Sequence, residues 1–83
     1  MNLTVRYFAS IREAVGLGSE AMQTQAATLS DLRAELILRG GAYADALTPG
    51  RAVRMALNQN LCEGTVALTE GCEVAFFPPV TGG

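Results

Sequence analysis

The chain has 83 residues, 49% of them hydrophobic and 17% charged, which predicts one small globular domain rather than a disordered segment. The net charge is −2 and all six basic residues are arginines that form no basic run, so we expect no nucleic-acid partner. No apolar stretch approaches the length of a membrane span, and the first residues do not resemble a signal peptide. We therefore expect a cytoplasmic protein without a membrane partner.

The first part of the chain predicts two strands around a short helix. Residues 3–8 alternate in polarity as a strand does. One face of this strand carries Leu3, Val5 and Tyr7, and the other carries Thr4, Arg6 and Phe8. Residues 9–15 predict a short helix that ends at Gly16, and residues 19–27 permit a second, weaker strand.

The clearest helix is predicted over residues 28–39. Thr28 suits the N-cap position, and Asp31 lies where a negative charge favours the start of a helix. The expected core stripe consists of Leu29, Leu32 and Leu36, with Leu38 as a further candidate. Gly40 and Gly41 predict the end of this helix, and a short turn is expected over residues 43–47.

The second half predicts short strands separated by turns. Strands are expected over residues 52–57 and 73–77, with shorter extended pieces at 61–62 and 66–68. Turns are expected at 58–60 and 69–71. In the final strand, Val74 and Phe76 are assigned to the core and Phe77 to the open face, because strand side chains alternate. One main helix on one face of a mixed sheet is an α+β arrangement.

The C-terminal residues Phe-Phe-Pro-Pro-Val-Thr-Gly-Gly are the most informative stretch of the chain. Pro78 and Pro79 fix φ and remove two backbone donors, which predicts that the last strand ends at residue 77. Gly82 and Gly83 carry no Cβ, so they can pass through a narrow channel and leave the terminal carboxylate uncrowded. We therefore expect a folded domain over residues 1–77 and a flexible tail over residues 78–83. Such a tail is typical of a delivery arm whose chemistry lies on the carboxyl group of Gly83.

These features together resemble a known family. Residues 8–13 (FASIRE), Asn58-Gln59 and residues 68–83 (LTEGCEVAFFPPVTGG) are similar to the small subunits of molybdopterin synthase, a sulfur-carrier branch of the ubiquitin-like proteins. The resemblance runs from end to end and implies a β-grasp fold, a mixed sheet packed on one main helix. Cys72 departs from the family pattern, which has an acidic residue there. We expect Cys72 to lie in a loop with little effect.

The resemblance implies a subunit that donates sulfur without catalysing a reaction itself. An ATP-dependent enzyme would adenylate the carboxylate of Gly83, and a sulfur donor would displace AMP to leave a thiocarboxylate. The tail, ending in Gly82 and Gly83, would enter the large subunit of molybdopterin synthase, in an expected heterotetramer. There it would give sulfur to cyclic pyranopterin monophosphate in molybdenum cofactor biosynthesis. The ATP belongs to the activating enzyme, so no cofactor is expected on this chain.

Partner contacts are expected around the tail. The first and last strands of a β-grasp sheet are parallel neighbours, so Phe8 and Phe77 should lie together on the open face as a docking patch. Arg12 matches the family pattern and is a further candidate for the docking face. The expected partner-binding residues are Phe8, Arg12, Phe77, Pro78, Pro79, Val80 and Thr81.

Independent catalysis is not expected. The chain has no histidine, Cys62 and Cys72 form no Cys-x-x-Cys motif, and no glycine-rich phosphate loop is present, so we expect neither a metal site nor an active site. Three alternatives to the molybdopterin role stay open: a sulfur carrier for thiamine or tRNA thiolation, a ubiquitin-like protein modifier, and a passive β-grasp binding module. A modifier with this sequence could not form chains on itself, because it contains no lysine.

Overall fold

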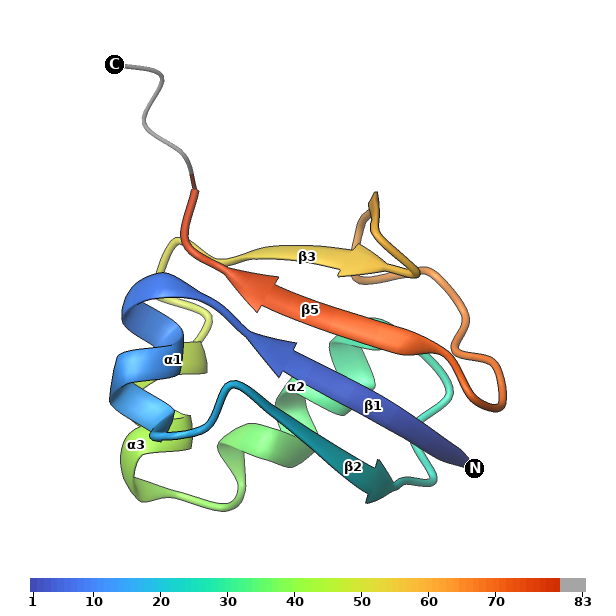
Figure 1. The fold of residues 1–83 in the computed structure, drawn as a ribbon, viewed down its shortest axis with the longest axis horizontal. Helices are drawn as coiled ribbons and strands as arrows, with labels where there is room; N and C mark the ends of the chain where they lie inside the picture. Colours follow the sequence, from blue (N-terminus) through green and yellow to red (C-terminus); the bar gives the residue numbers. More distant parts are fainter. Residues whose placement is uncertain (80–83) are drawn as a thin grey trace.

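The computed structural model describes residues 1–79, so four of the predicted tail residues, Val80, Thr81, Gly82 and Gly83, lie outside the described part. The elements in chain order are β1 (Asn2–Tyr7), α1 (Ala9–Val15), β2 (Ser19–Gln23), α2 (Leu29–Ile37), α3 (Gly41–Leu47), β3 (Arg54–Leu57), β4 (Asn60–Leu61) and β5 (Glu73–Phe77). Figure 1 shows their arrangement. Within residues 1–79, none of these helices has the length and apolar character needed to cross a bilayer.

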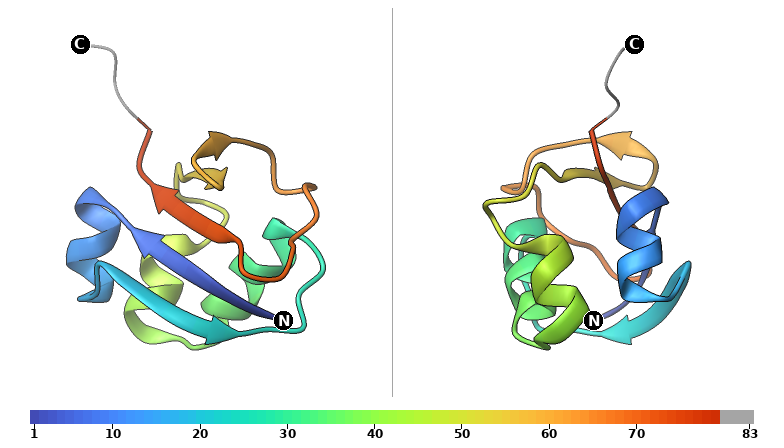
Figure 2. Two further views of the ribbon diagram at one scale, coloured as in Figure 1. Left: turned by 45° about the vertical axis from the view of Figure 1, so that its right-hand side comes forward. Right: turned by 90° about the vertical axis from the view of Figure 1, so that its left-hand side faces the viewer.

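The strands form one mixed sheet in the order β2-β1-β5-β3-β4. The first and last strands, β1 and β5, are parallel neighbours, and the other pairs are antiparallel. In Figure 1, α2 crosses behind the sheet, and α1 and α3 lie at the end where β1 and β5 finish. Figure 2 shows α2 and α3 side by side. This arrangement confirms the predicted β-grasp fold, a mixed sheet packed on one main helix.

The core lies between α2 and the inner face of the sheet. The helix contributes Leu29, Leu32 and Leu36, all fully buried as predicted. The sheet contributes Leu3, Val5, Tyr7, Val74 and Phe76. The further candidate Leu38 is wrong, because this residue is 86% exposed. It follows the last residue of α2, and residues two apart on a helix do not share a face, so Leu38 cannot extend the stripe that ends at Leu36.

The residues at the helix ends and in the β3–β4 turn have the side chains and backbone angles that these positions favour. The side chain of Thr28 caps α2 by accepting the N–H of Asp31 at 3.2 Å, as its position predicts. Gly16 ends α1 with a φ of 85° in the left-handed region that glycine tolerates. Asn58 and Gln59 have φ values of 49° and 69°, so both central residues of the β3–β4 hairpin are left-handed, as in a two-residue type I′ turn.

Several predicted boundaries differ from the structure. The weak strand predicted within residues 19–27 is present as β2 but ends at Gln23, and β3 begins at Arg54 rather than at residue 52. The extended piece at 66–68 forms only an isolated bridge between Ala67 and Thr28. These ends depend on which backbone groups find a partner strand, which local alternation does not reveal.

Cys72 requires a correction. It lies in the connection just before β5, outside the strands, as expected, but its side chain is 3% exposed and belongs to the hydrophobic core, so the expectation of little effect loses its basis. The residue lies just before β5, and its carbonyl accepts the N–H of Thr4 at 3.1 Å. This bond continues the contact between β5 and β1 by one residue, and the Cys72 side chain is thereby packed on the inner side of the sheet.

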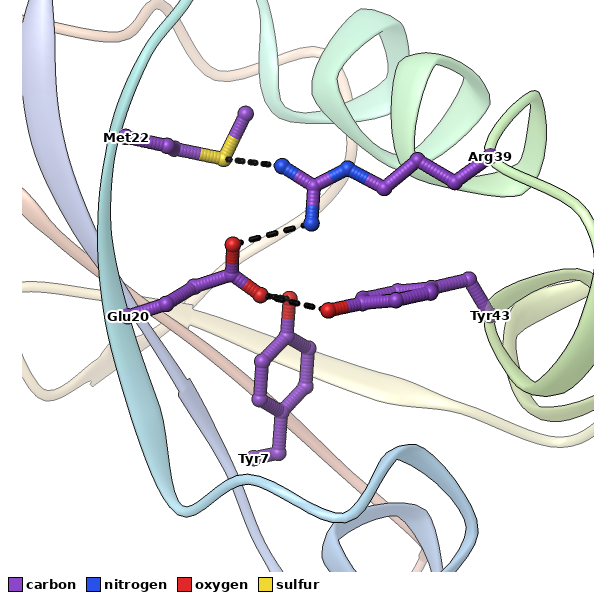
Figure 3. A network of polar contacts seen from close by, with 5 residues as sticks. All are labelled: Tyr7, Glu20, Met22, Arg39 and Tyr43. Atoms are coloured by element: carbon purple, nitrogen blue, oxygen red, sulfur yellow. Dashed lines mark hydrogen bonds and ion pairs between the residues drawn. The ribbon is translucent and has the colours of Figure 1, made fainter.

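A polar network ties the edge strand β2 to its neighbours (Figure 3). One carboxylate oxygen of Glu20, Oε2, accepts hydrogen bonds from the hydroxyls of Tyr7 at 2.9 Å and Tyr43 at 2.8 Å. The other, Oε1, accepts from the guanidinium of Arg39 at 2.8 Å. That guanidinium also lies over the Tyr43 ring, 4.8 Å from its centroid. The network thus joins β1, β2, α3 and Arg39, which lies just after α2.

The network also sets the ionisation of its members. Burial opposes the charge on Glu20, but hydrogen bonds from Arg39, Tyr43 and Tyr7 outweigh burial and hold the pKa of its carboxyl below the ordinary value. Burial and the neighbouring Glu20 carboxylate raise the pKa of both tyrosines. Because the hydroxyl of Tyr7 is fixed on the inner side, the next residue, Phe8, is directed to the outer side of the sheet.

Candidate functional site

The base of the tail lies against the folded body. β5 ends at Phe77, and the two prolines that follow, Pro78 and Pro79, are partly buried. Pro78 lines a hollow of about 120 Å³ whose other apolar walls are Ile11, Ala14, Ala46, Ala52 and Val53. These walls come from α1, α3 and the segment before β3. Neither proline can donate a backbone hydrogen bond, so the sheet stops and the tail begins at this rim.

Phe8 and Phe77 lie on the outer face of the sheet, opposite α2. Tyr7 pairs with Phe76 in the β1–β5 ladder, so Phe8 and Phe77 follow as the next neighbours, and the N–H of Phe8 donates to the carbonyl of Phe76 at 3.2 Å. Phe76 is fully buried, Phe77 is partly buried and Phe8 is 38% exposed. The strand register is therefore as predicted, although Phe77 is less exposed than expected. The docking role of the two rings stays a prediction.

One exposed residue, Leu61, and two buried alanines, Ala56 at 7% and Ala75 at 8% exposure, complete an apolar patch. Ala75 and Ala56 are partners across β5 and β3, and Leu61 is the partner of Ala56 on β4. All three share the face of Phe77, and Leu61 is 63% exposed. We call these five residues, Phe8, Ala56, Leu61, Ala75 and Phe77, the apolar patch. Sequence reasoning missed Leu61, although the register of a two-residue hairpin around Asn58-Gln59 would have placed it.

Charged side chains border the apolar patch. The guanidinium of Arg6 lies over the Phe8 ring, 5.2 Å from its centroid, and 3.8 Å from the carboxylate of Glu73. Arg54 is exposed and is the register partner of Phe77. The aromatic rings therefore have a cation on each side, one from β1 and one from β3.

Arg12, the other predicted docking residue, lies on α1 and is exposed. Its guanidinium lies against Gly18, where a Cβ would come within 3.3 Å of it. Its backbone N–H donates to the carbonyl of Phe8 at 3.2 Å. The structure thus places Arg12 one helical turn from Phe8 but beside the connection to β2. It does not bring Arg12 to Phe77, which lies beyond β1.

The backbone turns sharply after Phe8. Ala9 has a φ of 51°, which is unusual for a residue with a Cβ. The turn starts α1 and leaves Phe8 in extended backbone, with φ and ψ of −128° and 154°. Strained residues of this kind cluster at functional positions. Here the strain lies next to one of the two rings of the outer face.

Within residues 1–79, no three His, Cys, Asp or Glu side chains gather in a way that could hold a metal ion. Burial raises the pKa of the Cys62 thiol, and Glu63 acts in the same direction, so Cys62 is not disposed to be a nucleophilic thiolate. The arrangement can present a tail beside a partly apolar face.

Comparison with known proteins shows which family the chain belongs to. The model of the ThiS family matches residues 5–83. Molybdopterin synthase sulfur carrier subunits from Haemophilus influenzae and Escherichia coli are each 40% identical over 81 residues, which is 98% of this chain and 99% of each relative. Among solved structures, the complex of subunits 1 and 2 of the molybdopterin-converting factor from Helicobacter pylori contains a similar chain. That chain is 28% identical, with 100% of both chains covered and a TM-score of 0.70.

Proposed function

The chain belongs to the ThiS family, and we propose that within it this protein is the sulfur carrier subunit of molybdopterin synthase. The observation that carries the proposal is Gly82-Gly83 after Pro78-Pro79, at the end of a central strand and within a family match that extends to residue 83. The same chain therefore has both the Gly-Gly tail sequence and the folded domain against which the base of the tail lies.

The carrier chemistry takes place on the carboxyl group of Gly83. A carboxylate resists nucleophiles because it is negatively charged and has no good leaving group. Reaction with ATP on an activating enzyme forms an acyl adenylate and releases pyrophosphate. A sulfur nucleophile then forms the C–S bond, AMP leaves with the C–O bond electrons, and a thiocarboxylate remains. Its sulfur is anionic and bonds to cyclic pyranopterin monophosphate, and hydrolysis of the acyl–sulfur bond then leaves the sulfur on the substrate and restores the Gly83 carboxylate. Two such transfers complete the dithiolene of molybdopterin.

The body supports this chemistry by docking. The tail base is held beside the apolar patch, so a partner that covers the patch receives the tail at a defined place. Pro78 and Pro79 restrict the directions in which the chain can leave β5. Val80 and Thr81 lie between these prolines and the glycines, and we assign them to the partner's channel. Gly82 and Gly83 are assigned to its narrow end, where a side chain would clash.

Two kinds of partner are required. The first is the large subunit of molybdopterin synthase, in a heterotetramer of two carriers and two large subunits. The Helicobacter pylori complex of subunits 1 and 2 supports a partner of this type. The second is the adenylating enzyme, which brings the ATP. We place the protein in the cytoplasm, where ATP is available to that enzyme.

The test is the mass of the C-terminal peptide. The full chain is incubated with ATP, the adenylating enzyme and a sulfur donor, and intact-mass spectrometry should show one oxygen exchanged for sulfur on Gly83. A variant that lacks Gly83 should show no exchange. The loaded protein, mixed with the large subunit and cyclic pyranopterin monophosphate, should yield molybdopterin. If sulfur is loaded but passes only to a thiazole precursor or to tRNA, the protein is a carrier for another pathway. If the peptide never changes mass, the carrier function is wrong.

A further inference from the structure

Four of the six arginines form two contrasting pairs. Arg33 and Arg39 are committed to the fold, Arg33 through the carbonyls of Leu47 and Thr48 and Arg39 through Glu20. Arg51 and Arg54, by contrast, are exposed and lie beside the base of the tail. Arg51 lines the same hollow as Pro78, and Arg54 is the register partner of Phe77, so both border the residues from which the tail departs.

Among residues 1–79, no carboxylate forms an ion pair with either member of this pair. Within residues 1–79, the ion pairs are Arg6–Glu73 and Arg39–Glu20. The Nε of Arg51 donates to the backbone carbonyl of Asp45 at 3.0 Å, which orients the side chain without removing its charge. Glu63 lines a hollow together with Arg54 but forms no ion pair with it. A protein with a net charge of −2 therefore presents a local positive site at the tail base.

The position of the two arginines limits what they can contact. The four residues after Pro79 can span at most about 14 Å when fully extended. A tail that enters a partner to that depth carries the Gly83 carboxyl away from side chains on the body. Arg51 and Arg54 would then lie at the mouth of the partner's channel rather than at the reacting atoms. The adjoining apolar patch indicates a protein surface, because a phosphate or nucleic acid would not cover exposed Leu61 and Phe8.

We propose that Arg51 and Arg54 are recognised by carboxylates on the rim of the tail-receiving channel of the large subunit. The inference rests on the proposed function, and it adds that the partner's surface around the channel is negatively charged. In this arrangement the apolar patch supplies most of the affinity. The arginine pair steers the encounter, orients the carrier with its tail over the channel and disfavours partners with a basic rim.

The experiment measures association with the large subunit of the same organism by stopped flow at low and high salt. The variant is the double substitution Arg51→Gln, Arg54→Gln, which lowers the net charge by two. The matched control is Gln23→Glu, Gln25→Glu, which also lowers it by two. The control residues are exposed and lie at the opposite end of the sheet, where Gln23 pairs with Asn2 and Gln25 lines a hollow with Met1.

At low salt, the arginine variant should associate at least about fivefold more slowly than the wild type, whereas the control should stay within about twofold. At about 1 M salt, where the screening length falls to about 3 Å, the two variants should converge. Equal rates for the arginine variant and the control at low salt would overturn the inference. So would a defect that persists unchanged at high salt, because lost packing rather than charge would then be responsible.

Phe77→Ala in the same assay separates this inference from the proposed docking. If Phe77→Ala weakens binding at both salt concentrations while the arginine variant binds like the control, the patch docks and only the charge inference fails. If neither substitution affects binding, the outer face is not the docking surface, and both the inference and that part of the proposed function fail. Thermal melting of each variant alone confirms that the measured chains are folded.

Discussion

Phe76→Ala should destabilise the domain far more than Phe77→Ala, although the two residues are adjacent in β5. Phe76 is fully buried, and its ring stacks on Tyr7 with 6.3 Å between centroids. Its register partners are Tyr7 and Met55, which face the core. Truncating such a buried phenylalanine costs about 3–5 kcal/mol. A domain of this length has roughly 4–12 kcal/mol of unfolding free energy, so the substitution removes a large share of it.

The neighbouring ring faces outward. Phe77 is partly buried, so truncation removes only the contacts on its covered side, which corresponds to about 1–2 kcal/mol. One kcal/mol shifts the melting temperature of a domain this small by about 4–8 °C. Phe76→Ala should therefore lower the melting temperature by at least about 12 °C, and Phe77→Ala by at most about two-thirds of the Phe76→Ala shift.

Urea unfolding and binding titration distinguish the two roles. Urea curves measured at 25 °C give the free energy of unfolding of each variant, and titration against the large subunit gives its affinity. Phe77→Ala, with Phe8→Ala as its matched partner, should lose about 2 kcal/mol of binding energy if the rings are central anchors. If Phe77→Ala unfolds the domain and Phe76→Ala does not, the strand register is off by one residue and the inner and outer faces are exchanged.

The remaining predictions concern stability and the thiols. Glu20→Gln should cost about 1–3 kcal/mol at pH 7, because three hydrogen bonds to a charged acceptor are weakened. The pKa of Glu20 is lowered by folding, so its contribution to the free energy of unfolding is complete above about pH 4.5 and is lost as the pH falls below that value. Urea curves at pH 7 and pH 3 should show the free energies of unfolding of the variant and the wild type converging in acid. Cys72→Ser should lower the free energy of unfolding by about 1–3 kcal/mol because it buries a hydroxyl, whereas Cys62→Ser should have a smaller effect. A Cys62→Ser, Cys72→Ala chain that still folds should be loaded with sulfur as the wild type is, and loss of loading would indicate relay through a thiol. Ala9→Gly should raise the melting temperature by a few degrees, because relief of the left-handed backbone is worth about 1 kcal/mol; a lower melting temperature would show that this turn is not strained.

Sequence alone determined the features that are local or periodic. The stripe of Leu29, Leu32 and Leu36 follows from the 3.6-residue period of a helix, and the capping role of Thr28 follows from its side-chain chemistry. The alternation in β5 separated the buried Phe76 from the outward Phe77 before any neighbour was known. Sequence alone also predicts the tail, because prolines restrict the backbone and glycines free it wherever they occur.

Only the tertiary structure decided what depends on which strands become neighbours. Cys72 is buried because its carbonyl joins β1, and Leu61 belongs to the apolar patch because β4 pairs with β3. The partners of Glu20 lie 13, 19 and 23 residues away in the chain, so no local pattern could connect them. Arg51 and Arg54 gather at the tail base for the same reason, since the pairing of β3 with β5 brings them there. Side-chain period determines which face a residue takes, whereas strand order determines which residues share it.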